Sequence, residues 1–289
     1  MSNIDNKTYT GWKKWKPTNE EWATFSVEPY APFDMKENEY LLVYYDDENG
    51  VERLSAQYCM EGGKLRKFGR SSINFRSKKS ADKNVSIKAR NDEQICAIDL
   101  MKDRAKTIKL ICGSWGTGKT MLLVTAALEA LEKHEFERIV WIRNNVDVKD
   151  TKDLGALPGE VNDKLKCFLG PFVDHAGSAG VDCMLSNGNL VIEPLQSLRG
   201  RNLENCIIMC SEAENLTKEH IQLIIARAAN GSEVWFDADT RQRDKVAFEK
   251  SKGIETMIER FAGNELFGYV KLEKTERSKT AAMADLLND

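Results

Sequence analysis

The sequence predicts an α/β protein in which helices sandwich a parallel β-sheet, preceded by a small β-meander. The first observation behind this fold class is the alternation of short apolar runs with helix-forming segments from residue 91 onward. Apolar runs of about four to six residues between helices are typical of parallel strands that are buried on both faces. The second observation is that the first of these runs, residues 107–112, leads into a glycine-rich loop and then into a segment rich in helix formers.

The remaining elements of the predicted sheet follow in order along the chain. A helix is expected over residues 91–104, where Asp92 and Glu93 favour the positive end of a helix dipole. Further strands are expected at residues 138–142, 190–194, 206–210, 233–236 and 268–273. Ligands of such sheets bind beyond the carboxyl ends of the strands. The loops that follow the first, fourth and fifth predicted strands should therefore meet at one site.

Shifts in composition divide the chain into four regions. Residues 1–38 are expected to be an irregular segment, residues 39–75 a small β-meander, residues 76–90 a basic linker, and residues 91–289 the α/β domain. In the first region, Trp12 and Trp15 alternate with lysines. This pattern suits stacking on nucleic-acid bases. It also fits tryptophans that dock on the body of the protein and bury their large apolar area there.

One stretch of the chain, residues 64–90, is clearly basic and holds ten lysines and arginines. These side chains could contact a nucleic-acid backbone, or they could belong to a solvated linker between two parts of the protein. Both alternatives stay open. The whole chain has 42 basic and 45 acidic residues, a formal charge of −3. This balance does not exclude a nucleic-acid partner, because local patches decide binding.

Cysteine spacing and hydropathy exclude several classes of protein. The seven cysteines have no regular close spacing and the three histidines lie far apart, so neither a disulfide framework nor a zinc site is expected. The N-terminus lacks the apolar core of a signal peptide, and no apolar stretch reaches the roughly 18 residues of a membrane span. The expectation is a cytoplasmic protein with no membrane partner.

The glycine-rich loop is the most specific motif of the sequence. Residues 113–120 read GSWGTGKT and match the phosphate-binding pattern G-x-x-x-x-G-K-[ST]. The glycines allow a tight turn that aims backbone N–H groups at phosphates, next to the positive end of the following helix. Lys119 is expected to reach the β- and γ-phosphates of ATP, and Thr120 to offer its hydroxyl to Mg²⁺. The predicted nucleotide-binding residues of the loop are Gly113, Ser114, Trp115, Gly116, Thr117, Gly118, Lys119 and Thr120.

Acidic and polar residues follow the fourth and fifth predicted strands. After the fourth come Ser211 and Glu212, and Glu212 is placed to act as general base for water. Ser211 stands where an acid on the magnesium side is expected, and its hydroxyl can hydrogen-bond a metal-bound water without adding charge. The fifth strand leads to Asp237, Asp239 and Gln242, which could sense the γ-phosphate or orient the attacking water. Ser211 and Asp239 are therefore candidates to hold Mg²⁺ through water.

With these motifs in place, the chain resembles PhoH-like ATPases over residues 88–285. The motifs that carry the resemblance fall in the family's order: residues 91–94 (NDEQ), the 113–120 loop, residues 154–159 (LGALPG), 199–201 (RGR) and 211–215 (SEAEN), Asp239 with Gln242, and residues 276–278 (ERS). Their combination is far more specific than the loop alone. The resemblance implies that residues 91–289 form a PhoH-like RecA-type ATPase domain, similar to the core of superfamily 1 helicases, in a protein of bacteria or their phages.

The resemblance also implies roles for residues that the pattern alone does not assign. Gln94 would read the adenine edge of ATP, and Arg277 or Arg201 would neutralise the transition state, from the same chain or from a neighbouring subunit. The family's ring assemblies, often hexamers, imply a homo-oligomeric ring. The implied activity is Mg²⁺-dependent hydrolysis of ATP that drives a helicase-like motor on RNA or single-stranded DNA.

Departures from the family pattern leave alternatives open. Ser211 replaces the usual Asp, Glu214 replaces Gln, and Ala238 replaces Gly. Ser211 could prevent efficient turnover, which would make the protein a nucleotide-gated module that binds nucleic acid or protein rather than a motor. A kinase is a further alternative, because P-loops also serve phosphate transfer to an acceptor. The first 38 residues are too short for the nuclease domain that some relatives carry, so no nuclease activity is expected.

Overall fold

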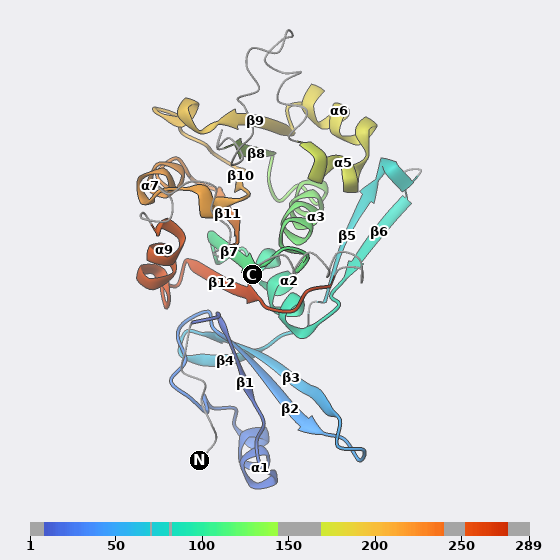
Figure 1. Ribbon diagram of the computed structural model, residues 1–289, viewed down its shortest axis with the longest axis vertical. Helices are drawn as coiled ribbons and strands as arrows, with labels where there is room; N and C mark the ends of the chain where they lie inside the picture. The colour runs from blue at the N-terminus through green and yellow to red at the C-terminus, as the bar shows by residue number, and fades with distance from the viewer. Residues whose placement is uncertain (1–8, 70, 81–82, 144–168, 240–251, 277–289) are drawn as a thin grey trace, which may run out of the picture.

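The centre of the structure is a six-stranded sheet in which all strands are parallel. The computed structural model describes residues 9–69, 71–80, 83–143, 169–239 and 252–276. Within these ranges the strands of the sheet are β7 (Ile108–Gly113), β8 (Arg138–Arg143), β9 (Leu190–Pro194), β10 (Cys206–Cys210), β11 (Glu233–Ala238) and β12 (Phe267–Leu272), in the order β12-β7-β11-β10-β8-β9. The predicted α/β fold, RecA-like in its arrangement, is confirmed (Figure 1).

Strand β11 lies between β10 and β7, the strand that leads into the glycine-rich loop. Asp237 of β11 pairs with Ile111 on one side, and Phe236 pairs with Cys210 on the other. The carboxyl ends of the three strands therefore meet at one edge of the sheet, as expected. The end of β11 lies closer to the glycine-rich loop than the end of β10 does, because β10 is one strand further away.

Helices cover both faces of the sheet (Figure 1). One face carries α2 (Asp92–Lys102), α3 (Lys119–Glu132), α5 (Gly170–Ala176) and α6 (Ser178–Ser186). The other face carries α7 (Lys218–Ile225), α9 (Gly253–Phe261) and the 3-10 turns η3 (Leu195–Leu198) and η4 (Ala213–Asn215). Neighbouring strand residues alternate between these layers, since Trp235 packs on the α3 side and Phe236 on the α7 side. No described helix is long and apolar enough to cross a membrane.

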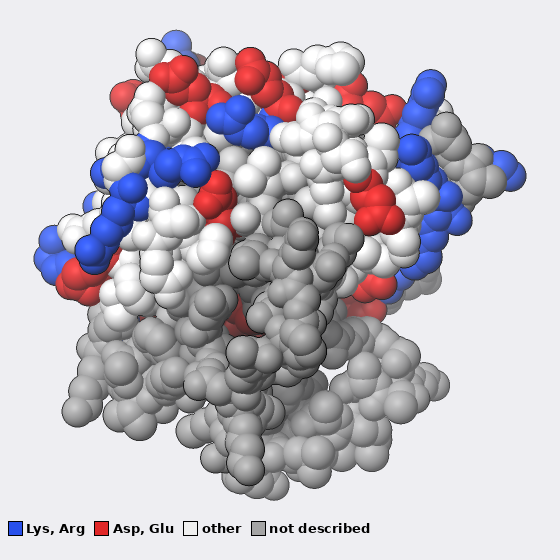
Figure 2. Space-filling view, turned by 90° about the horizontal axis from the view of Figure 1, so that it is seen from above, with Lys and Arg blue, Asp and Glu red and all other residues white. Residues whose placement is uncertain are grey.

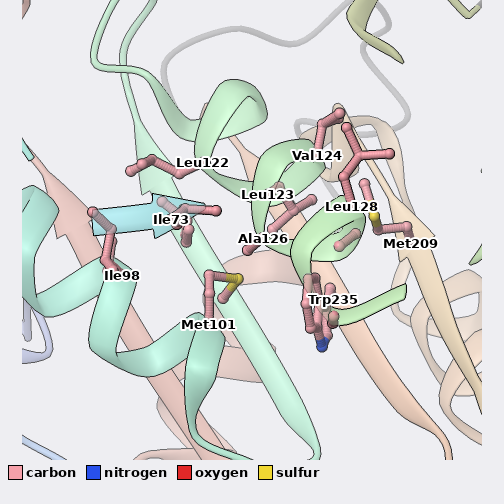
Figure 3. Close-up of a cluster of buried hydrophobic side chains, with 14 of the residues drawn as sticks. Ile73, Ile98, Met101, Leu122, Leu123, Val124, Ala126, Leu128, Met209 and Trp235 are labelled. Carbon is pink, nitrogen blue, oxygen red and sulfur yellow. The ribbon is translucent and has the colours of Figure 1, made fainter. Parts of the chain in front are cut away.

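Helix α3 is buried on nearly all sides, with every residue from 122 to 130 shielded from solvent. Figure 3 shows the side chains that surround it: Ile73 from β5 (Ser72–Ser77), Ile98 and Met101 from α2, and Met209 and Trp235 from the central sheet. A helix that is apolar all round is stable only inside a core. Its first residue, Lys119, is therefore held at a defined position relative to the sheet.

The N-terminal region is more regular than the sequence suggested. The expectation of an irregular segment over residues 1–38 is wrong for the described part, which contains β1 (Trp12–Trp15) and α1 (Asn19–Val27). Strand β1 pairs in parallel with β2 (Tyr40–Asp46), which continues antiparallel through β3 (Glu52–Glu61) to β4 (Lys64–Lys67). Local patterns do not reveal β1, because it is short and its partner strand comes much later in the chain.

The two tryptophans of β1 dock on the protein body. Trp15 is only 6% exposed and packs edge-on against Phe25 of α1, with ring centroids 5.0 Å apart. The ring N–H of Trp12 donates a hydrogen bond to the Lys271 carbonyl of β12 over 2.8 Å. Of the two alternatives for these tryptophans, the structure shows the docked one.

The expected linker over residues 76–90 is instead part of a β-hairpin. Strand β5 pairs antiparallel with β6 (Lys83–Lys88), with the turn η1 (Lys78–Ser80) between them. Ile73 and Phe75 of β5 are buried in the α3 layer. The charged side chains that suggested a linker occupy the outer face only. The meander therefore ends with β4 rather than near residue 75.

The N-terminal sheet is attached to the central sheet along β12. The backbone N–H of Lys271 donates to the Thr10 carbonyl over 2.9 Å. Asn38 contributes a side-chain amide that donates to three carbonyls, those of Asn264, Glu265 and Phe267, at 2.9–3.0 Å. These contacts cover the outer edge of β12, which would otherwise present unpaired backbone groups.

Gly11 packs directly against the backbone of β12 in this attachment. It adopts a φ of +78°, and a Cβ added there would lie 1.8 Å from the Tyr269 carbonyl oxygen. We expect Gly11→Ala to lower the free energy of unfolding by about 2 kcal/mol or more, through backbone strain and overpacking together. Gly50→Ala is the matched control, because Gly50 has a φ of +72° and nothing within 4 Å. Urea denaturation should show a clearly smaller loss for the control, and equal losses would contradict the proposed clash.

Candidate nucleotide site

The glycine-rich loop has the geometry of a phosphate site. Gly116 and Gly118 have φ values of +75° and +92°, which a glycine adopts without strain. The Thr117 hydroxyl donates to the Ser114 carbonyl over 2.8 Å and closes the turn. Gly118 caps α3 without any side-chain hydrogen bond, so the first backbone N–H groups of the helix have no side-chain cap. An anion at this point would meet both these donors and the positive end of the helix dipole.

Gln94 of α2 contacts the backbone of the glycine-rich loop. Its side chain is 1% exposed, and its amide donates to the Thr117 carbonyl over 2.9 Å. Its amide oxygen accepts a hydrogen bond of 2.9 Å from the backbone N–H of Arg90. A Cβ at Gly118 would lie 3.1 Å from the Gln94 amide nitrogen, a close contact at a position whose φ of +92° already favours glycine. Gln94 therefore ties α2 to the loop, while its expected contact with adenine stays a prediction.

The segment after β12 reaches the loop from the other side. Glu276 donates its backbone N–H to the Gly116 carbonyl over 2.9 Å, and its carboxylate accepts from the Asn91 side chain over 2.8 Å. These two contacts bring together three of the motifs that carried the resemblance. Arg277 comes next in the sequence but lies outside the described residues, as does Gln242.

Asp237, at the end of β11, is a buried acid beside the first residues of α3. It is fully buried, and its Oδ1 accepts a hydrogen bond of 2.9 Å from the backbone N–H of Glu212. Burial raises the pKa of Asp237, whereas the Thr120 hydroxyl and the Lys119 ammonium beside it act in the opposite direction. Sequence reasoning placed Asp237 near the γ-phosphate or the attacking water, but it did not show that Asp237 faces Thr120.

The residues that follow β10 are arranged around Asp237. Ser211 is half-buried, and Glu212 is exposed with a φ of +56°, a left-handed conformation that strains a non-glycine residue. Because the Glu212 N–H binds Asp237, this conformation is anchored to β11. Asp239 is 2% exposed, and its backbone N–H donates to the Glu214 carboxylate over 2.9 Å. The loops after β10 and β11 thus form one connected group, as their sequence positions predicted.

Arg201 lies apart from this group within one chain. Its guanidinium pairs with Glu193 of β9 over 3.1 Å. Strand β9 is at the far edge of the sheet, with β8, β10 and β11 between it and β7. This position favours a role of Arg201 in a neighbouring subunit, one of the two possibilities that the resemblance left open, and that role stays a prediction.

The site also fits a magnesium ion. Mg²⁺ keeps several waters and usually takes one or two protein carboxylates together with substrate phosphates, rather than a cage of protein ligands. In keeping with this, no group of three or more His, Cys, Asp or Glu side chains among the described residues is arranged to hold a metal. The Thr120 hydroxyl and the Asp237 carboxylate are oxygen donors of the right chemistry. These residues would hold the ion together with a bound nucleotide.

Glu214 is a buried acid that sequence reasoning did not single out for function. It is 8% exposed, and burial raises its pKa to about 8. The negative charge of Asp237 acts in the same direction, and Lys119 acts against it. In the sequence, Glu214 differs from a solvent-exposed acid only by following a fully apolar strand.

We expect Glu214→Gln to change how stability depends on pH. Because the folded-state pKa is about 8, the wild-type folded protein keeps a proton that the unfolded chain releases above about pH 4.5. This contribution to stability is complete below pH 4.5 and is lost as the pH rises through 8. The variant should therefore gain stability relative to wild type by up to about 1.4 kcal/mol per pH unit across this window. Denaturation of metal-free and nucleotide-free protein measures the difference, and a constant difference would contradict the expectation.

Comparison with known proteins gives the family. The family model described as PhoH-like protein matches residues 86–288, which is more than half of the chain. Protein PhoH2 of Bacillus subtilis is 34% identical over 212 residues, covering 70% of this chain and 48% of that protein. Protein PhoH2 of Mycolicibacterium smegmatis is 32% identical over 201 residues (68% and 46%), and protein PhoH of Escherichia coli is 27% identical over 201 residues (68% and 55%). The chain spans about half the length of these relatives. The match to the family model and the glycine-rich loop together show that the chain belongs to the PhoH-like family of P-loop nucleotide-binding proteins.

Proposed function

We propose that the protein binds ATP with Mg²⁺ at the β7–α3 loop and hydrolyses it to ADP and phosphate. The observation that carries this proposal is the arrangement at the start of α3, where Lys119 and Thr120 face the buried carboxylate of Asp237. A cation, a hydroxyl and a carboxylate beside an uncapped helix N-terminus suit a nucleotide phosphate chain with its metal. Family membership supports the P-loop chemistry.

Each residue has a defined part in this proposal. Lys119 and the loop N–H groups stabilise negative charge on the transferred phosphoryl group. Thr120 would contribute an oxygen to Mg²⁺ bound with the nucleotide, and the ion would offset the negative charge of the phosphates. Glu212, whose exposed side chain follows β10, takes a proton from the attacking water. Gln242 orients that water, and Arg277 or the Arg201 of a neighbouring subunit neutralises the transition state.

Hydrolysis is best tested by phosphate release with Mg²⁺-ATP, in the presence and absence of single-stranded RNA and DNA. We expect Lys119→Ala to lower the rate about a hundredfold or more, because it removes a charge that stabilises the transition state. Lys133→Ala is the matched control, since Lys133 is an exposed lysine just beyond the other end of α3 and should leave the rate unchanged. Transfer of phosphate to an acceptor without free phosphate would indicate a kinase instead.

The alternative is a nucleotide-gated binding module, and Ser211 is the observation that favours it. A hydroxyl at the end of β10 contributes no charge on the magnesium side, so turnover could be very slow. Tight ATP binding without phosphate release in the wild-type protein would support the binding module and contradict the proposal of an ATP-driven motor. A rate that rises by orders of magnitude in Ser211→Asp would lead to the same conclusion.

We further propose that the protein acts on RNA or single-stranded DNA, as a ring of identical subunits in the cytoplasm of a bacterium or of a phage host. Support for the nucleic-acid partner comes from the β5–β6 hairpin. Its exposed cations are Arg76, Lys78, Lys79, Lys83 and Lys88. Figure 2 shows lysine and arginine side chains gathered on the side of the molecule where this hairpin lies. Part of the basic stretch is excluded from this surface, because Arg66 of β4 pairs with the buried Asp99 over 3.1 Å.

The exposed cations of the hairpin predict how nucleic-acid affinity depends on salt concentration. Replacing Lys78, Lys83 and Lys88 by glutamine removes three exposed charges, and each phosphate contact on a single strand contributes about 0.7 to the slope of log affinity against log salt. We expect the slope for a single-stranded polymer to become shallower by about 2. The control replaces Lys13 and Lys14 of β1 and Lys16 just after it, which changes the charge equally at a surface with no proposed nucleic-acid contact. An unchanged slope in the hairpin variant would contradict its role.

A further inference from the structure

Ser211 leaves a charge deficit at the magnesium side of the site. Its hydroxyl follows β10 at the place where the resemblance leads us to expect a carboxylate. Phosphate groups with a divalent cation are usually faced by at least one protein carboxylate. The neighbouring strand β11 offers such a carboxylate, that of Asp237.

Asp237 lies level with Ser211 but one strand closer to the loop. Cys210 of β10 pairs with Phe236 of β11, so the next residues of the two strands follow side by side. Trp235 packs against α3 (Figure 3). Phe236 packs in the layer on the opposite face of the sheet. Because side chains alternate along a strand, Asp237 points to the α3 side, as Trp235 does. Helix α3 packs on β11 and begins with the loop residues, so Asp237 meets the start of this helix directly.

The contacts of Asp237 leave one carboxylate oxygen available. Oδ1 accepts the Glu212 N–H over 2.9 Å. Oδ2 is buried and has no hydrogen bond of normal geometry among the described residues, although the Thr120 hydroxyl and Lys119 lie near the carboxylate. Keeping a buried, half-satisfied carboxylate is unfavourable unless a cation compensates it. Thr120, the expected magnesium ligand, lies beside this carboxylate.

Two neighbouring acids, Glu212 and Glu214, are placed differently. Glu212 is exposed, and its backbone N–H donates to Asp237. Glu214 uses its carboxylate to accept the Asp239 N–H over 2.9 Å. Asp237 is thus a described acid that is fully buried, adjacent to Thr120 and equipped with an unpartnered oxygen.

We propose that Asp237 carries the negative charge on the magnesium side of the bound nucleotide, so that the charge absent at the end of β10 is supplied from the end of β11. This inference rests on the proposed nucleotide function. It assigns to Asp237 a role different from sensing the γ-phosphate or orienting water. It also explains how Ser211 is compatible with a site that handles Mg²⁺. Through Oδ1, the same carboxylate positions the backbone of Glu212.

The test compares Asp237→Asn, Ser211→Ala and the double variant Asp237→Asn with Ser211→Asp. The probe is a fluorescent, non-hydrolysable ATP analogue, titrated with Mg²⁺ after binding in EDTA. Asparagine keeps an acceptor for the Glu212 N–H, and thermal melting verifies folding; Asp237→Ser is a second replacement should asparagine not be tolerated. We expect all variants to bind the analogue in EDTA like wild type. The half-saturating Mg²⁺ concentration should rise about tenfold or more in Asp237→Asn, stay unchanged in Ser211→Ala, and recover in the double variant.

The outcomes separate this inference from the function on which it rests. A loss of the Mg²⁺ response in Ser211→Ala with none in Asp237→Asn would overturn the inference, and so would equal losses in both. Mn²⁺ in place of Mg²⁺, followed by electron paramagnetic resonance, gives the same comparison without any turnover. Failure of the wild-type protein to bind the analogue at all would overturn the proposed function first, and the inference with it.

Discussion

The burial of α3 is the constraint on which the rest of the structure depends. This helix is enclosed by the central sheet, by α2 and by the β5–β6 hairpin, and its apolar residues face all three (Figure 3). A helix enclosed in this way cannot shift along its axis without opening the core. Its N-terminus, with Lys119 and Thr120, therefore stays fixed above the ends of β7 and β11. The hairpin in this way helps to position the residues at the start of α3, even though its outer face is charged.

Electrostatics at the end of α3 follow from this placement. Two buried carboxylates, Asp237 and Glu214, lie within reach of a single lysine, Lys119, and burial raises the pKa of both acids. A phosphate chain alone would add further negative charge to this group. A divalent cation bound with the nucleotide would offset this negative charge.

The N-terminal sheet protects the open side of the central sheet. Thr10, Trp12 and Asn38 supply hydrogen-bonding partners to the backbone of β12 and the turn before it. An uncovered parallel edge strand would be a template for unwanted pairing. Beyond β12, Glu276 binds the glycine-rich loop, so the same strand links the attached sheet to the nucleotide site. The N-terminal sheet is therefore linked to Gly116 through β12 and Glu276.

The sequence by itself determined the parallel α/β fold and the phosphate-binding loop, because both are encoded in local patterns. Apolar runs marked β7, β8, β9, β10, β11 and β12, and the glycine spacing marked residues 113–120 with Lys119 and Thr120. The tertiary structure alone decided how β1 pairs with β2, that β5 and β6 form a hairpin that packs on α3, and that Asp237 faces Thr120. Each of these depends on which strands become neighbours. Strand order joins segments far apart in the chain, and hydrophobic periodicity along one segment carries no record of its partner.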